Sequence, residues 1–368
     1  MSFRISALLA CLLSVSSLAR AQDDEQKFAP VGPFVFLVDD KVSLKPDGSY
    51  LFQHSEGDLI FEAQIAPDVR IVDNFGRALE RVFAKDKPRV FAYSAFGTFL
   101  VRLRMFDEVS DPVRTPSYMP KGTIQLAWLK NRSSADPDAD PVAFIKGPVE
   151  MWLVNAIPFG HHSNGQNGCL FLGQVRVDGE CGPPPPATAG PGEVNVQDGS
   201  FSTNYIRVGL DYRRLYADGD DANDIRAITR REWGIGGSLE LNPSGYVGGA
   251  LDEALRPLYG PTRFQLTGDV LAGNFRIPVW PGRSVHCGRA WTNAAVTFIS
   301  GAAESVDDVA TSIEAACLPA RWGGAGLFVR YYRGQDYYNA SFLQNINRLQ
   351  FGVTFLQGKF LAFRTVSN

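Results

Sequence analysis

Apolar and polar residues alternate with a period of two along much of the chain. In residues 99–105 the odd positions are apolar, and two of the even positions are arginines. The same alternation recurs in residues 124–128, 263–267, 293–298 and 348–355. A period of two is typical of β-strands with one apolar and one polar face. It predicts ten to thirteen strands between about residue 48 and residue 360, separated by turns rich in Gly, Pro and Asp.

Two architectures give this alternation, a soluble β-sandwich and a transmembrane β-barrel. The polar positions repeatedly carry Arg, Gln and Thr, which suits a wet or networked lumen. The strands also recur along the whole chain, with no change of composition that would mark a second domain. We therefore expect an all-β protein, an antiparallel transmembrane β-barrel formed by residues 46–360 as a single domain.

The N-terminus has the features of a secretory signal peptide at residues 1–21. Arg4 supplies the positive charge, residues 5–18 are apolar, and residues 19–21 form a small-x-small cleavage site. We expect residues 22–45 to form a polar periplasmic segment and residues 361–368 a C-terminal tail. No apolar run of 18 residues follows the leader, so no transmembrane helix is expected.

Composition and cysteine content narrow the class of protein further. The 368 residues are 20% charged with a net charge of −3, which excludes a disordered chain and a strongly basic nucleic-acid binder. Four cysteines remain after the leader, and an even number in an exported chain favours disulfides. The simplest pairs are Cys169–Cys181 and Cys287–Cys317, although four cysteines permit three pairings and the sequence does not choose among them.

The first candidate for chemistry is the segment His161-His162-Ser163. His161 and Ser163 are two residues apart, so on a strand they share a face. Counting back in steps of two puts apolar residues on that face, which would make it the lipid side: Leu153, Ile157 and Phe159. The same count puts His162 on the lumen side with Trp152 and Val154.

A second strand is predicted after a long irregular segment, residues 164–199. Its even positions from Ile206 to Leu210 are apolar, whereas its odd positions carry Tyr, Arg and Asp. Asn204 therefore faces lipid, and pairing of the two strands would gather Ser163, His161 and Asn204 on the outer surface. His161 could then take the proton of Ser163 as that hydroxyl attacks an ester carbonyl, while Asn204 accepts the ring N–H. Because Asn204 is neutral, a bound cation near the oxyanion would help.

Four separated motifs carry a resemblance to a known family. They are H-x-S-N-G at residues 161–165, S-x-S-x-N at 200–204, S-D-P-V-R at 110–114 with Tyr118 and Pro120, and Y-R-G-Q-D-Y-Y-N at 332–339. In these motifs the chain resembles the outer-membrane phospholipase A family.

This resemblance implies a twelve-stranded antiparallel barrel that acts as a calcium-dependent, homodimeric phospholipase A1. It implies Ser163 as nucleophile, His161 as general base and Asn204 as the residue that orients it. It also implies Ca²⁺ ligands: the Ser200 hydroxyl, the Gln166 backbone carbonyl and, across the dimer interface, Ser110. The segment between Gln166 and Ser200 is much longer than in the family, which leaves open whether it separates these two ligands or covers the site.

The expected function is hydrolysis of acyl ester bonds of phospholipids that reach the outer leaflet of the outer membrane. The sn-1 bond is expected, with the sn-2 bond left open, and the products are fatty acid and lysophospholipid. Two alternatives remain at this point. The chain could be a non-enzymatic outer-membrane barrel, either a pore or a structural protein, or a secreted soluble β-protein.

Overall fold

A computed structural model describes most of the chain from residue 36 to residue 355. The described residues are 36–37, 49–54, 59–66, 68–83, 89–106, 113–133, 147–182, 194–216, 231–243, 255–280, 283–319 and 325–355. The expected leader, the C-terminal tail, most of segment 22–45 and the calcium-ligand candidate Ser110 lie outside these residues.

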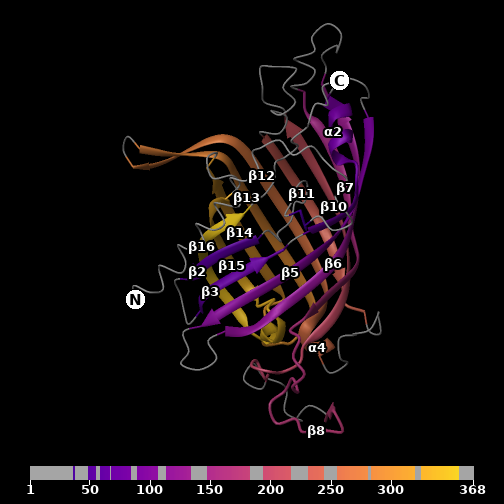
Figure 1. The fold of residues 1–368 in the computed structure, drawn as a ribbon, viewed down its shortest axis with the longest axis vertical. Helices are drawn as coiled ribbons and strands as arrows, with labels where there is room; N and C mark the ends of the chain where they lie inside the picture. Colours follow the sequence, from indigo (N-terminus) through magenta and orange to yellow (C-terminus); the bar gives the residue numbers. More distant parts are fainter. Residues whose placement is uncertain are drawn as a thin grey trace. The chain divides into compact units, whose positions relative to one another are not determined.

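Strands make up most of the described chain (Figure 1). Along the chain they are β1 (Phe36–Leu37), β2 (Ser49–His54), β3 (Leu59–Ile65), β4 (Asp68–Asp73), β5 (Arg89–Phe106), β6 (Val113–Asn131), β7 (Val149–Ser163), β8 (Arg176–Val177), β9 (Glu180–Cys181), β10 (Ser202–Tyr216), β11 (Arg231–Leu241), β12 (Gly260–Trp280), β13 (Arg283–Ala302), β14 (Val309–Leu318), β15 (Ala325–Gln335) and β16 (Asn345–Phe355). Three short helices accompany them: α2 (Phe75–Phe83), α4 (Arg256–Tyr259) and the 3-10 helix η3 (Asn339–Leu343).

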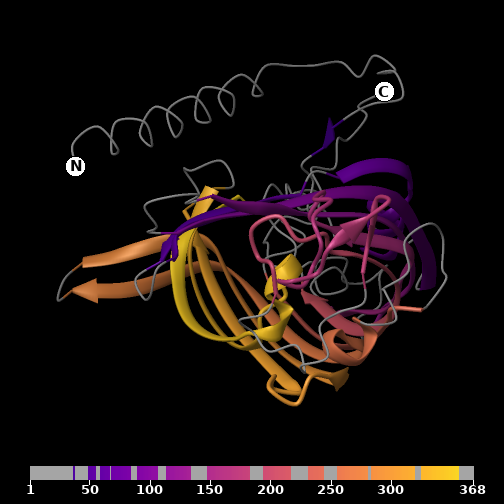
Figure 2. The same ribbon diagram turned by 90° about the horizontal axis from the view of Figure 1, so that it is seen from below.

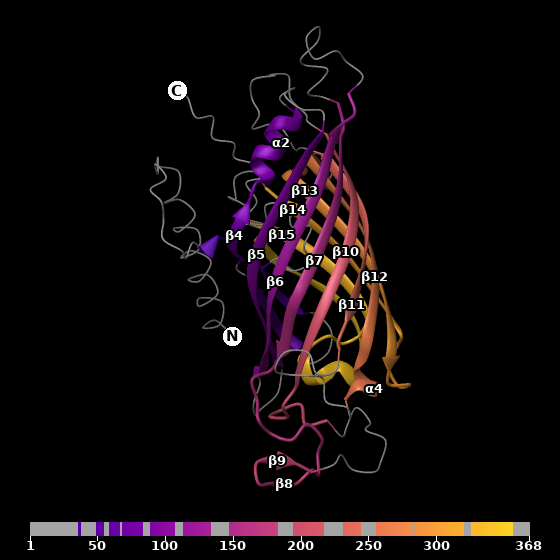
Figure 3. The same ribbon diagram turned by 90° about the vertical axis from the view of Figure 1, so that its right-hand side faces the viewer.

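The main sheet closes on itself into a barrel. Neighbouring strands are antiparallel and mostly consecutive in sequence, and β5 pairs with both β6 and β3. Ile65 of β3 lies opposite Val101, and Asp68 of β4 lies opposite Thr98, so β3 and β4 follow β5 in one register. The fourteen strands of this sheet, without the two-residue β1 and with β3 and β4 counted as one, form a ring of twelve. The expected antiparallel barrel is confirmed, and its strands run obliquely side by side (Figure 3).

The outer surface of the barrel is apolar and its interior is charged. Outward positions carry large exposed apolar side chains, among them Val208, Leu210, Phe264, Leu266, Leu349 and Phe351. Inside, Arg104 lies 2.5 Å from Glu62 and 2.5 Å from Asp336, and all three side chains are buried. A soluble β-protein has the reverse arrangement, whereas membrane barrels face lipid with their apolar side. None of the described helices is both long and apolar enough to cross a membrane.

An internal helix, α2, was not expected from the sequence. The Asp73 carboxylate accepts a hydrogen bond from the Phe75 N–H at 2.9 Å and so caps the start of α2. The apolar side of α2 packs on inward residues of β5, β6, β7 and β10, forming one buried cluster: Phe75, Ala78, Leu79, Val82, Phe83, Ala92, Ala127, Leu129, Val149, Met151, Leu153 and Leu215. Near this end of the barrel, apolar side chains therefore also face inward.

Both expected disulfides are present. Cys169–Cys181 lies within segment 164–199, where β8 and β9 form a small hairpin (Figure 3). Cys287–Cys317 joins β13 to β14. Beyond Ala272, the last partner of β11, strands β12 and β13 pair with each other and project from the barrel as a hairpin (Figure 2).

The apolar outer surface predicts a large difference between two Leu→Arg substitutions. Leu210 on β10 is 49% exposed and Leu172 in segment 164–199 is 53% exposed. If the barrel wall faces lipid, Leu210→Arg should lower the free energy of unfolding in lipid vesicles by roughly 2–4 kcal/mol. Leu172→Arg, which lies outside the strands, should change it by no more than about 0.5 kcal/mol. Urea titration of both variants measures this, and equal effects would argue against a lipid-facing wall.

Candidate active site

Strand pairing brings the expected catalytic residues together. In the register of β7 and β10, Asn204 lies opposite His161 and Ser202 lies opposite Ser163. Side chains of directly opposed residues share a face of the sheet. His161 Nδ1 and Asn204 Oδ1 are 2.7 Å apart. Because an amide oxygen only accepts hydrogen bonds, Nδ1 carries the proton and Nε2 is left as a proton acceptor.

Ser163 is the last residue of β7 and lies on the same face as His161. On the other side of β7 it is opposite Tyr118 of β6, whose ring is exposed on the outside of the barrel. Within the described chain, no hydrogen bond joins Ser163 to His161. Catalytic hydrogen bonds are often long before substrate binds, so the shared face is the relevant observation here.

The structure corrects part of the expected facing of β7. Leu153 and Ile157, expected toward lipid, are buried, and Leu153 is 0% exposed in the cluster with α2. Trp152, expected in the lumen with Val154, is 48% exposed on the outside. The reason is a register shift between residues 156 and 160, where β7 has one residue more than both neighbouring strands.

Downstream of that shift the expected facing holds. Phe159 is exposed, and His162 is buried in the lumen with 1% exposure. His162 packs against Phe201 edge-on and against Tyr337 at a tilt, with ring centroids 5.0 and 5.1 Å away. Its Nε2 is 3.4 Å from the Ser117 hydroxyl. The two histidines of the pair therefore lie on opposite sides of the barrel wall.

The long segment between Gln166 and Ser200 does not separate these two residues. The buried Asn164 side chain donates to the Gly199 carbonyl at 2.7 Å and accepts from the Phe201 N–H at 3.0 Å. Its Oδ1 also accepts from the Gln166 N–H at 3.3 Å. Asn164 thus fastens both ends of the segment beside Ser163.

Two backbone hydrogen bonds also join the two ends of the segment, close to the Asn164 contacts. The Ser200 N–H donates to the Gly168 carbonyl at 2.8 Å, and the Gly168 N–H donates to the Asp198 carbonyl at 3.0 Å. The segment therefore leaves the barrel wall and returns to it at the site.

The residues expected to hold Ca²⁺ offer a suitable set of donors. Gln166 would supply a backbone carbonyl and Ser200 a hydroxyl, and hard oxygen donors are what Ca²⁺ takes. No cluster of three or more His, Cys, Asp or Glu able to hold a metal occurs among the described residues. Gln166 and Ser200 both lie next to Asn164, so oxygen donors of the kind that Ca²⁺ takes are present beside Ser163.

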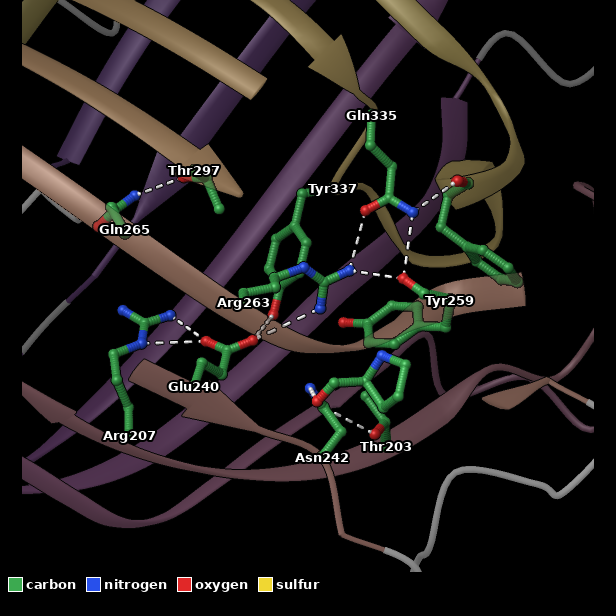
Figure 4. Close-up of polar contacts among 12 residues, drawn as sticks. Thr203, Arg207, Glu240, Asn242, Tyr259, Arg263, Gln265, Thr297, Gln335 and Tyr337 are labelled. Atoms are coloured by element: carbon green, nitrogen blue, oxygen red, sulfur yellow. Dashed lines mark hydrogen bonds and ion pairs between the residues drawn. The ribbon is translucent and has the colours of Figure 1, made fainter. Parts of the chain in front are cut away.

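Behind the site, the lumen holds a network that the sequence analysis did not assemble (Figure 4). Glu240 of β11 accepts from the Arg207 Nε at 3.0 Å and from the Tyr337 hydroxyl at 3.2 Å, and it lies 3.5 Å from Arg263 Nη1. Thr203, the neighbour of Asn204, donates to Asn242 Oδ1 at 3.1 Å. The sequence signals for its members were the polar positions of β10, the alternation at residues 263–267 and the motif at residues 332–339.

The same network borders a cavity of about 230 Å³ inside the barrel. Its charged lining residues are Arg102, Lys121, Arg207, Glu240, Arg263, Glu314 and Arg330. Side chains from opposite walls meet across the lumen, because Arg263 of β12 bonds Gln335 of β15 at 2.9 Å and Arg104 of β5 bonds Asp336 at 2.5 Å. The described lumen is therefore crossed by polar contacts.

Comparison with known proteins finds similarity at the level of structure only. No family model matches the chain, and no curated protein matches it in sequence. Outer membrane phospholipase A from Escherichia coli is similar with a TM-score of 0.41 at 14% identity, over 85% of this chain and 94% of that one. The Salmonella typhi outer membrane phospholipase, a dimer with bound calcium, gives 0.43 at 13% identity, over 90% and 96%.

A more distant similarity is to the β domain of the Bordetella autotransporter BrkA, with a TM-score of 0.28 at 11% identity over 83% of this chain and 95% of that one. The chain thus resembles outer-membrane barrels, including phospholipase A. At these scores the likeness assigns no residue, so the roles of the site residues are argued from their own geometry.

The closure by Asn164 can be tested by removing its side chain. Asn164→Ala leaves the Gly199 carbonyl and the Phe201 N–H without their partner, which should cost about 1–3 kcal/mol of stability. It should also speed proteolysis within residues 166–199. Asn167→Ala is the matched control, since it removes the same amide from an exposed position. If both variants resist protease as the unmodified chain does, Asn164 does not hold the segment.

Proposed function

We propose that this protein is a calcium-dependent phospholipase of the outer membrane. It hydrolyses the sn-1 acyl ester bond of glycerophospholipids to lysophospholipid and fatty acid. Cleavage of the sn-2 bond as well is left open. The observation that carries the proposal is the hydrogen bond between His161 and Asn204 on the outer, apolar face of the barrel, with Ser163 on the same face. A base and nucleophile that face lipid suit a substrate that is itself a lipid.

The proposed chemistry follows from the roles of these three side chains. Asn204 holds the His161 ring with Nδ1 protonated, so Nε2 takes the proton of Ser163 as its oxygen attacks the ester carbonyl. The protonated His161 then gives this proton to the departing lysophospholipid alcohol, which leaves an acyl group on Ser163. Water, deprotonated by His161, releases the fatty acid and regenerates the serine.

The proposed role of the cation is to stabilise the oxyanion. Asn204 is neutral and stabilises a protonated His161 less than a carboxylate would, so positive charge elsewhere has more to contribute. Bound Ca²⁺ would stabilise the negative charge that develops on the carbonyl oxygen. Gln166 and Ser200, fastened together through Asn164, would hold it from one copy of the chain, and Ser110 of a second copy would complete the site in a homodimer.

The lumen supports an enzyme over a pore. Contacts such as Arg263–Gln335 join strands across the interior, and α2 fills part of one end with an apolar cluster. A second apolar cluster fills space at the end that carries segment 164–199, with Phe201, Tyr259 and Phe342 among its members. A wide aqueous channel would need these contacts to be absent.

The nucleophile is tested by comparing two serines that lie opposite each other. Ser163→Ala should lower the rate of fatty-acid release from phosphatidylcholine micelles by on the order of a thousandfold or more. Ser202→Ala removes the same hydroxyl from the opposed residue and should retain hydrolysis. Heat-modifiable gel migration confirms that both variants are folded. Hydrolysis that survives Ser163→Ala would exclude Ser163 as the nucleophile.

Calcium dependence is tested by chelation and by one ligand variant. EDTA should abolish fatty-acid release, and added Ca²⁺ should restore it. Ser200→Ala should weaken Ca²⁺ binding by about tenfold or more, as losses of metal-site contacts usually do, and titration calorimetry measures this without any turnover. Full activity in EDTA would leave an esterase without the proposed cation.

A further inference from the structure

Strand β10 keeps one facing along its length, and β6, on the other side of β7, keeps one facing from Ser117 onward. In β6 the odd residues are buried from Ser117 to Asn131, and in β10 the odd residues are buried or half-buried from Thr203 to Leu215. Their exposed residues are even-numbered, for example Tyr118 and Trp128 in β6 and Val208 and Leu210 in β10. An uninterrupted strand has this constant alternation.

β7 changes its facing in the middle of the strand. Met151 and Leu153 are buried inside while Trp152 is exposed, so upstream the odd residues face inward. Downstream, His162 is buried inside while Phe159 is exposed, so the even residues face inward. Without this change, His161 and Ser163 would face the lumen and His162 would face lipid.

The change coincides with one extra residue in β7. Against β10, Tyr205 lies opposite Gly160 and Arg207 lies opposite Ile157, so two steps on β10 match three on β7. Against β6, Gly122 lies opposite Phe159 and Ile124 lies opposite Ala156, again two steps against three. The unmatched residues are Pro158 and Phe159 against β10 and Ile157 and Pro158 against β6, so both neighbours place a β-bulge at Pro158. Proline suits a bulge because it has no N–H to offer to the ladder.

Contacts in the lumen hold the downstream facing. The Tyr205 ring lies so close over Gly160 that a Cβ at residue 160 would be 2.2 Å from it, so only glycine fits there when residue 160 faces inward. His162 sits between Phe201 and Tyr337. A slip of β7 by one residue would push Phe159 or His161 into this packed space.

We infer that the bulge at Pro158 is the positioning element of the site: it turns Ser163 and His161 outward to lipid and selects His161 over His162 as the base. Pro158 and His162 are therefore positioning residues. This inference rests on the proposed function for its catalytic meaning, whereas the facing itself is independent of activity.

Single cysteines along β7 test the facing directly. Trp152→Cys, Leu153→Cys, His162→Cys and Ser163→Cys are each made in a Cys11→Ser background, where the other four cysteines are paired in disulfides. Folded protein in detergent micelles is treated with N-ethylmaleimide, and the mass of the product is measured. Trp152→Cys and Ser163→Cys should react, while Leu153→Cys and His162→Cys should be protected. Reaction at both even positions or at both odd positions would overturn the inference.

Deletion of Pro158 tests the cause. In the folded deletion variant, the labelling pattern downstream of residue 158 should reverse: His162→Cys should become reactive and Ser163→Cys should become protected. A chain that carries only the deletion should no longer release fatty acid. Pro158→Ala is the matched control, because it keeps the number of residues and should leave the labelling pattern unchanged. An unchanged pattern after deletion overturns the inference.

The two proposals fail in distinguishable ways. If the deletion variant does not fold, the labelling of the four cysteine variants still decides whether the facing changes within β7. If the facing changes as described but the unmodified chain releases no fatty acid with Ca²⁺ present, the phospholipase proposal fails and the bulge remains.

Discussion

The closed ring of backbone hydrogen bonds is the constraint on which the rest of this structure depends. Every backbone N–H and C=O in a lipid environment needs a partner within the protein, and a sheet meets this need only when its first and last strands pair. Here β5 pairs with β6 on one side and with β3 and β4 on the other. Once the ring is closed, alternation assigns each side chain to lipid or to lumen.

The same alternation directs charged side chains into the lumen, behind the outer face of the barrel. Arginines such as Arg104, Arg213 and Arg263 are buried, and each lies beside at least one carboxylate. Buried charges of this kind are tolerated only when they are paired and hydrogen-bonded. The Arg104–Asp336 pair joins residues far apart in sequence and so links two walls of the lumen.

The proposed site combines two paired strands with the two ends of segment 164–199. His161 and Asn204 are held by the β7–β10 ladder, while Gln166 and Ser200 are held by the Asn164 side chain at the base of segment 164–199. The proposed catalytic pair and the proposed oxygen donors for a cation therefore both lie at the end of β7. A substrate bound at this point would contact both the proposed catalytic pair and the proposed cation.

The sequence by itself left the choice among the three cysteine pairings open, but it determined the class of fold and the set of candidate site residues. These features depend on local periodicity and on short motifs, which a linear chain displays directly. The face of β10, and with it the outward Asn204, was also predicted correctly because β10 has no interruption. Only the tertiary structure decided the facing of Leu153 and Trp152, the packing of α2 inside the barrel, and the closeness of Gln166 to Ser200. A bulge, an internal helix and a side chain that bridges 35 residues all depend on partners distant in sequence, and the period of one strand carries no information about them.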